Sequence, residues 1–131
     1  MKRTMRRLGG TAAALALFWA LAQAQTARFK YHGLLSRVIT PNSDHNNDVA
    51  VICFDNFSDV GVEGTIYTPL GTEVARMTRQ DPPAVNCTQG NKPQGLVWDG
   101  RVGGAVVPSG IYIYKVRTDF QVFTGTILVV R

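Results

Sequence analysis

The chain has 131 residues, of which 45% are hydrophobic, and carries 14 Lys and Arg against 9 Asp and Glu. This length fits one domain with a single hydrophobic core. Four of the cations lie in the first 24 residues, so the other 107 residues carry ten basic against nine acidic side chains, a net charge of +1. That balance excludes the basic footprint of a nucleic-acid-binding protein.

Residues 1–24 have the three-part pattern of a secretory signal peptide. A positive end is followed by an apolar run over residues 12–21 and by Ala22-Gln23-Ala24, which places small residues where a signal peptidase cleaves. We expect cleavage after Ala24 and a secreted, periplasmic or cell-surface product. A retained membrane anchor is the alternative, but the apolar run is shorter than the ~20 residues that span a bilayer.

Residues 25–37 form either an N-terminal arm or a simple first strand. The segment places four apolar side chains among basic residues: Phe29, Tyr31, Leu34 and Leu35. As an arm, it would add as a strand to the open sheet edge of a neighbouring copy. Repeated head to tail, that contact would build a filament, because a heterologous interface need not close.

The next expected strand, residues 34–40, is stopped by Pro41 and followed by a polar loop over residues 42–48. Asp44, Asn46 and Asp48 alternate as oxygen ligands do in calcium-binding loops. The same residue types form ordinary turns, because their side chains cap the nearby backbone. Calcium binding and a structural turn are both open interpretations, and no other cofactor is indicated.

Three further strands are expected, because short apolar–polar alternations are separated by Gly, Pro, Asn and Asp. They cover residues 49–55, 62–68 and 72–77. The inward positions are then Ile52, Phe54, Val62, Gly64, Ile66 and Val74.

Residues 78–95 are polar and rich in Pro, Asn and Gln, and we expect them to be irregular. Cys87 lies in this stretch and Cys53 in an expected strand. A disulfide between them suits an oxidising compartment and would stabilise the fold by ~3–4 kcal/mol. The alternative is a buried free thiol at Cys53.

Extended structure resumes over residues 96–99, and residues 111–118 and 122–130 form an expected terminal hairpin that turns near Asp119-Phe120. The total is about seven strands. This number predicts an all-β fold, an immunoglobulin-like antiparallel β-sandwich over residues 38–131.

Several residues of this C-terminal third have fold-determining roles. Trp98 is expected to fill the space between two sheets, and Asp99-Gly100 to make a tight turn in which glycine accepts a positive φ. A second turn at Pro108-Ser109-Gly110 feeds Tyr112, Tyr114 and Val116 inward, while Lys115 and Arg117 face water.

These motifs also carry a family resemblance. The segments Trp98-Asp99-Gly100-Arg101, Pro108-Ser109-Gly110-Ile111-Tyr112 and Ile66-Tyr67 resemble the Ig-like domain of the bacterial flagellar hook-capping protein. They are equally similar to C-terminal modules of secreted bacterial proteins, including gliding-motility and type IX secretion substrates. The sequence departs from the family pattern at Ser43, His45 and Thr68. With no hook-binding region upstream, we do not expect a hook-capping role.

No serine-nucleophile motif, phosphate loop or pair of carboxylates in apolar surroundings is evident. We therefore expect a non-enzymatic structural or interaction module without a small-molecule substrate. Its partners would be proteins, including copies of itself in a surface fibre or appendage. The alternative is a secretion-recognition module of the type IX kind, or a small exported cargo.

Overall fold

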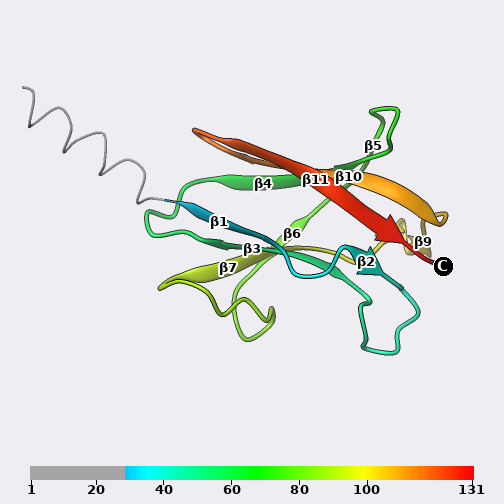
Figure 1. The fold of residues 1–131 in the computed structure, drawn as a ribbon, viewed down its shortest axis with the longest axis horizontal. Helices are drawn as coiled ribbons and strands as arrows, with labels where there is room; N and C mark the ends of the chain where they lie inside the picture. Colours follow the sequence, from blue (N-terminus) through cyan, green and yellow to red (C-terminus); the bar gives the residue numbers. More distant parts are fainter. Residues whose placement is uncertain (1–28) are drawn as a thin grey trace, which may run out of the picture.

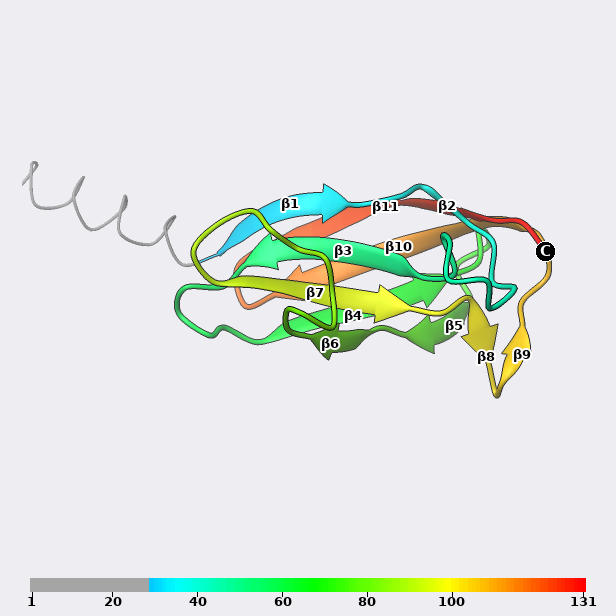
Figure 2. The same ribbon diagram turned by 90° about the horizontal axis from the view of Figure 1, so that it is seen from below.

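The computed structural model describes residues 29–131, which form two β-sheets packed face to face as a β-sandwich (Figures 1 and 2). The predicted signal peptide, its cleavage site and residues 25–28 lie outside the described residues. Within residues 29–131, no helix is long and apolar enough to cross a membrane.

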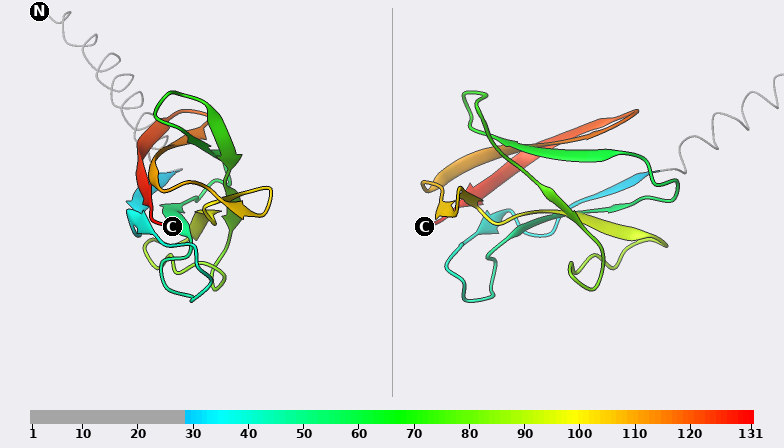
Figure 3. Two further views of the ribbon diagram at one scale, coloured as in Figure 1. Left: turned by 90° about the vertical axis from the view of Figure 1, so that its right-hand side faces the viewer. Right: turned by 180° about the vertical axis from the view of Figure 1, so that it is seen from behind.

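The strands of the described residues are β1 (Lys30–Leu34), β2 (Val38–Ile39), β3 (Ala50–Asp55), β4 (Val62–Tyr67), β5 (Glu73–Arg76), β6 (Thr78–Gln80), β7 (Pro93–Trp98), β8 (Arg101–Val102), β9 (Ala105–Val106), β10 (Gly110–Thr118) and β11 (Val122–Val129). The first sheet of the sandwich has the order β1-β3-β7-β6, and the second sheet has the order β2-β11-β10-β4-β5. A third, two-stranded sheet consists of β8 and β9. All neighbours are antiparallel except β2 and β11, which are parallel. The end-on view in Figure 3 shows the two layers.

The core lies between the sheets and follows the alternation of the strands. Along β10, Tyr112, Tyr114 and Val116 are buried while Lys115 and Arg117 are exposed, as expected from side chains that alternate across a strand. Trp98 enters from the opposite sheet and meets Tyr112 edge-on, with ring centroids 5.5 Å apart. Other fully buried side chains come from both sheets and include Ile39, Ile52, Phe54, Ile66, Leu96, Ile127 and Val129.

Two turns follow Trp98 along the chain. One lies between β7 and β8, and the other lies between β9 and β10. Gly100 has φ +70°, and a Cβ there would lie 2.6 Å from Pro41, so the turn requires glycine. The Arg101 amide donates to the Asp99 carboxylate at 3.0 Å, and the Trp98 indole donates to the Arg101 carbonyl at 3.2 Å. At the next turn, the Tyr112 hydroxyl donates to the Pro108 carbonyl at 2.7 Å, just before Gly110 begins β10.

Two predictions about strands were wrong. Residues 34–40 are not one strand, because the chain leaves the first sheet after β1 and joins the second sheet as β2. Residues 78–95 are not wholly irregular, because they contain β6 and the first half of β7. β6 has only three residues at a sheet edge and no buried side chain, so it lacks an apolar pattern that sequence analysis could detect.

Cys53 and Cys87 form a disulfide, with 5.5 Å between the Cα atoms. The bridge holds residues 81–92 against the outer face of the first sheet, where a small second cluster forms from Val51, Cys53, Val85 and Cys87. The buried Asp55 carboxylate anchors the same loop by accepting hydrogen bonds from the amides of Asn91 at 3.0 Å and Lys92 at 2.6 Å.

Candidate functional site

The polar loop over residues 42–48 uses its carboxylates to hold its own backbone. The Asp48 carboxylate accepts hydrogen bonds from the amides of Asn42, Ser43 and His45 at 2.7–3.0 Å. Desolvation opposes ionisation of Asp48, but these three donors outweigh it and lower its pKa. Residues Ser43, His45 and Asn47 have positive φ, the left-handed conformation that is common in turns.

The other predicted calcium ligands take part in the same turn. Asp44 accepts hydrogen bonds from the Asn42 side chain at 3.0 Å and from the Asn46 amide at 2.8 Å. This is the hydrogen bonding of a structural turn. No group of three or more His, Cys, Asp or Glu side chains is placed to hold a metal ion anywhere in residues 29–131. Calcium binding by Asp44, Asn46 and Asp48 stays a prediction.

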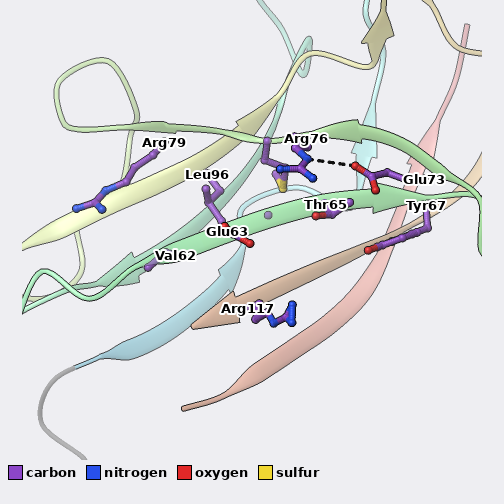
Figure 4. Close-up of a pocket in the computed structure, with 11 residues that line it drawn as sticks. Val62, Glu63, Thr65, Tyr67, Glu73, Arg76, Arg79, Leu96 and Arg117 are labelled. Atoms are coloured by element: carbon purple, nitrogen blue, oxygen red, sulfur yellow. Dashed lines mark hydrogen bonds and ion pairs between the residues drawn. The ribbon is translucent and has the colours of Figure 1, made fainter. Parts of the chain in front are cut away.

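A cavity of about 260 Å³ opens between β4 and the β5–β6 segment (Figure 4). Two of its arginines are paired, Arg76 with Glu73 at 3.2 Å and Arg79 with Asp59 at 2.7 Å. The hydrogen bond from Arg79 holds the pKa of Asp59 below its usual range. Sequence reasoning missed this cavity because its lining comes from five strands. Glu63 and Arg117 also line the cavity, so acidic and basic side chains are mixed there and do not form a concentrated anion or cation site.

The four apolar residues of the predicted arm lie mostly inside the chain's own sandwich. Tyr31 stacks on Phe123 with ring centroids 4.3 Å apart, and its hydroxyl is 2.7 Å from that of Tyr114. Phe29 stacks on Phe54 at 5.2 Å. Leu34 also packs against the core, whereas Leu35 is exposed. The segment that contains β1 thus contributes a core strand to its own chain.

The edges of the two sheets differ in how they are protected against pairing with another chain. Native edge strands usually carry charges, bulges or prolines, or are very short. β1 has Lys30 and an irregular register between Tyr31 and Gly33. β5 carries Glu73 and Arg76, and the three-residue β6 carries Arg79.

β11 lacks all of these protections over most of its length. It has eight residues, none of them charged and none of them proline. β2 pairs with it only at Leu128 and Val129 among the described residues. Figure 1 shows β2 near the C-terminal end of β11. Residues 122–126 therefore have β10 as their single neighbour within the described chain. We call residues 122–126 the open β11 edge.

The hydrogen-bond pattern shows which backbone groups face outward at the open β11 edge. The Thr118 amide donates to the Gln121 carbonyl at 2.9 Å within the hairpin, and the Leu128 amide donates to the Arg37 carbonyl at 2.7 Å on the opposite side. Because successive residues point their amides to alternate sides of a strand, the amides of Val122, Thr124 and Thr126 face away from β10. Residues 29–131 give these amides no backbone partner.

No protein-family model, curated protein or solved structure matches the chain. The function of the protein is therefore inferred from the edge geometry, the burial and the hydrogen bonds of residues 29–131.

Proposed function

We propose that this protein is a non-enzymatic module that works outside the cytoplasmic membrane and binds other proteins through the open β11 edge. The observation that carries the proposal is the uncharged edge itself, with outward amides at Val122, Thr124 and Thr126. Such an edge is a template for an added strand, in which backbone hydrogen bonds supply affinity. The edge strands β1, β5 and β6 are protected by charge, shortness or an irregular register.

We also propose that the sandwich is immunoglobulin-like. In that fold, the sheets contain the strand orders A-B-E-D and C-F-G. The orders β1-β3-β7-β6 and β4-β10-β11 correspond to them, and β5 extends the second sheet beside β4. One feature differs from antibody domains: the disulfide joins β3 to a loop instead of joining the two sheets. The family resemblance through Trp98 and Tyr112 is consistent with this assignment, because both side chains pack in the core.

Export is supported by the disulfide as well as by the predicted signal peptide. Stable disulfides form in secreted and periplasmic proteins and are rare in reducing compartments. The bridge between Cys53 and Cys87 is buried and holds a loop of the domain in place. We therefore propose a secreted, periplasmic or cell-surface location.

Assembly into a fibre by adding the N-terminal arm to the sheet edge of a neighbouring copy would require β1 to leave its own sheet. Tyr31 would then lose its stacking on Phe123 and its hydrogen bond to Tyr114. The open β11 edge offers a contact that needs no such rearrangement. We therefore place the proposed interaction at β11 and not at the arm.

The alternative proposal is a recognition module for a type IX-like secretion machine. Processing of such a module would remove its C-terminal end. Here Ile127 and Val129 are fully buried, so cleavage would remove core side chains. Mass spectrometry of the exported protein separates the two proposals, because an intact residue 131 contradicts processing at the C-terminus.

Site-specific photo-crosslinking in the producing cell tests the proposed function. A photoreactive residue in place of Thr124 should give crosslinks to protein. The matched control is Lys115, which is exposed on the same face, pairs with Thr124, and lies on a strand with neighbours on both sides. Equal crosslinking from both positions, or none from Thr124, would contradict binding through the edge.

A further inference from the structure

We propose that the open β11 edge pairs with the same edge of a second copy, antiparallel and across a two-fold axis at Thr124. This inference rests on the proposed function and names its partner. The two second sheets would then join into one continuous sheet. An interface of this kind is self-complementary, because each surface patch meets itself.

The hydrogen-bonding groups match under this symmetry. Thr124 faces Thr124 of the second copy, and Val122 faces Thr126 of the second copy. Each of these residues has its amide and carbonyl pointing toward the other copy. Two hydrogen bonds form at each hydrogen-bonded antiparallel pair. A pairing shifted by one residue would set outward groups against inward ones.

The length of the edge fits the same pairing. β2 occupies the edge from Leu128 onward, and the hairpin turn ends the strand before Val122. The free segment is therefore centred on Thr124. A partner strand centred on the same residue uses the whole segment without displacing β2.

The side chains are also suited to a two-fold pairing. Thr124 would meet its own copy on the outer face, and threonine pairs across antiparallel strands are favourable. On the inner face, Phe123 would lie opposite Gly125 of the second copy, an arrangement in which an aromatic ring covers a glycine. Gly125 is bare for an internal reason, because a Cβ there would overlap the Tyr114 ring.

Charge and apolar surface are complementary at both ends of the proposed pairing. Beyond Val122 the partner strand ends in its hairpin turn, so Asp119 and Phe120 leave the ladder next to the start of β2, where Arg37 and Val38 lie. Arg37 and Asp119 are exposed and form no ion pair within the described residues. Phe120 is 70% exposed and Val38 is 42% exposed. The two-fold axis repeats this contact at the other end, and this repeated match favours a second copy over an unrelated peptide.

Sedimentation equilibrium tests the proposal on the exported protein with its disulfide formed. The wild type should show a reversible monomer–dimer equilibrium. Thr124→Pro should weaken dimerisation at least tenfold, because proline lacks the amide that faces the second copy. The hydrogen bonds between β11 and β10 should stay intact, because the Thr124 amide does not take part in them. Thr124→Val retains the amide and should dimerise like the wild type. Matching thermal unfolding of the three proteins would show that the fold is intact.

A charge exchange provides a second test. Arg37→Glu and Asp119→Lys should each weaken the dimer, and the double variant should recover most of the wild-type affinity. A wild type that stays monomeric, or a Thr124→Pro variant that dimerises normally, would overturn the inference. Open-ended oligomers would also overturn it. If the wild type is monomeric but crosslinks from position 124 to another protein, the self-pairing fails while the proposed function stands.

Discussion

The outer faces of the two sheets differ in whether another segment of the chain covers their apolar side chains. On the first sheet, Val51 and Cys53 are covered by a loop that the disulfide holds in place. On the second sheet, Val38, Leu128 and Ile111 lie on neighbouring strands and remain exposed. β3 is thus buried on both faces, whereas β10 and β11 are buried on one.

Apolar side chains on the outer faces of this sandwich are therefore either covered by a loop or exposed to solvent. Where the chain covers them, they add to stability as a second small core. Where it does not, they give the surface an apolar character next to the open β11 edge, and isolated exposed apolar side chains cost little. The following predictions test this comparison.

Removing the disulfide should have the largest effect. In the double variant Cys53→Ala, Cys87→Ala, the free energy of unfolding should fall by about 3–4 kcal/mol, because the unfolded chain is no longer constrained by a loop that spans 34 residues. Residues 81–92 should also lose protection from amide hydrogen exchange. Urea unfolding gives the first quantity. An unchanged stability would show that the covering loop contributes nothing to the first sheet.

A matched pair of truncations compares the two faces directly. Val51→Ala should cost about 2 kcal/mol, because Val51 is buried beneath the loop. Ile111→Ala should cost less than about 0.5 kcal/mol, because Ile111 is 55% exposed. Both values come from chemical unfolding at neutral pH. Equal losses would mean that the second sheet's outer face is covered in solution.

Tyr31→Phe tests a contact between the two sheets. The loss of the hydrogen bond to Tyr114 should lower the free energy of unfolding by about 1 kcal/mol. Burial, followed by this hydrogen bond, raises the pKa of Tyr31 above that of an unfolded tyrosine. Stability from the neutral phenol is therefore complete below pH ~10 and is lost at higher pH. The wild type should lose more stability than Tyr31→Phe between pH 9 and pH 11, and equal slopes would contradict the assignment.

The smallest effect is expected in the loop that joins β2 to β3. The pKa of Asp48 is lowered in the fold. Its contribution to the stability of the fold is therefore present above pH ~4 and is lost as the pH falls through the folded pKa. Amide signals of Asn42, Ser43 and His45 should shift together on acidification. Asp48→Asn should abolish that shared titration. A titration that persists in the variant would assign it to another group.

The interior of the sandwich was largely predictable from the sequence. The alternation in residues 111–118 placed Tyr112, Tyr114 and Val116 inward, and glycine in the Asp99-Gly100 pair indicated the turn. Short elements were not predictable: β2, β6, β8 and β9 have two or three residues each, too few to show a period. The cavity beside β4 was equally invisible, because its lining is gathered from distant segments.

The open β11 edge shows most clearly where sequence information ends. Residues 111–118 and 122–130 both alternate as strands, and the sequence by itself determined which side chains of each point inward, because the direction of a side chain follows from local backbone geometry. Only the tertiary structure decided that, within residues 29–131, β10 has two neighbours while most of β11 has one. Strand neighbours depend on pairing between residues far apart in the chain, and no local pattern records that pairing.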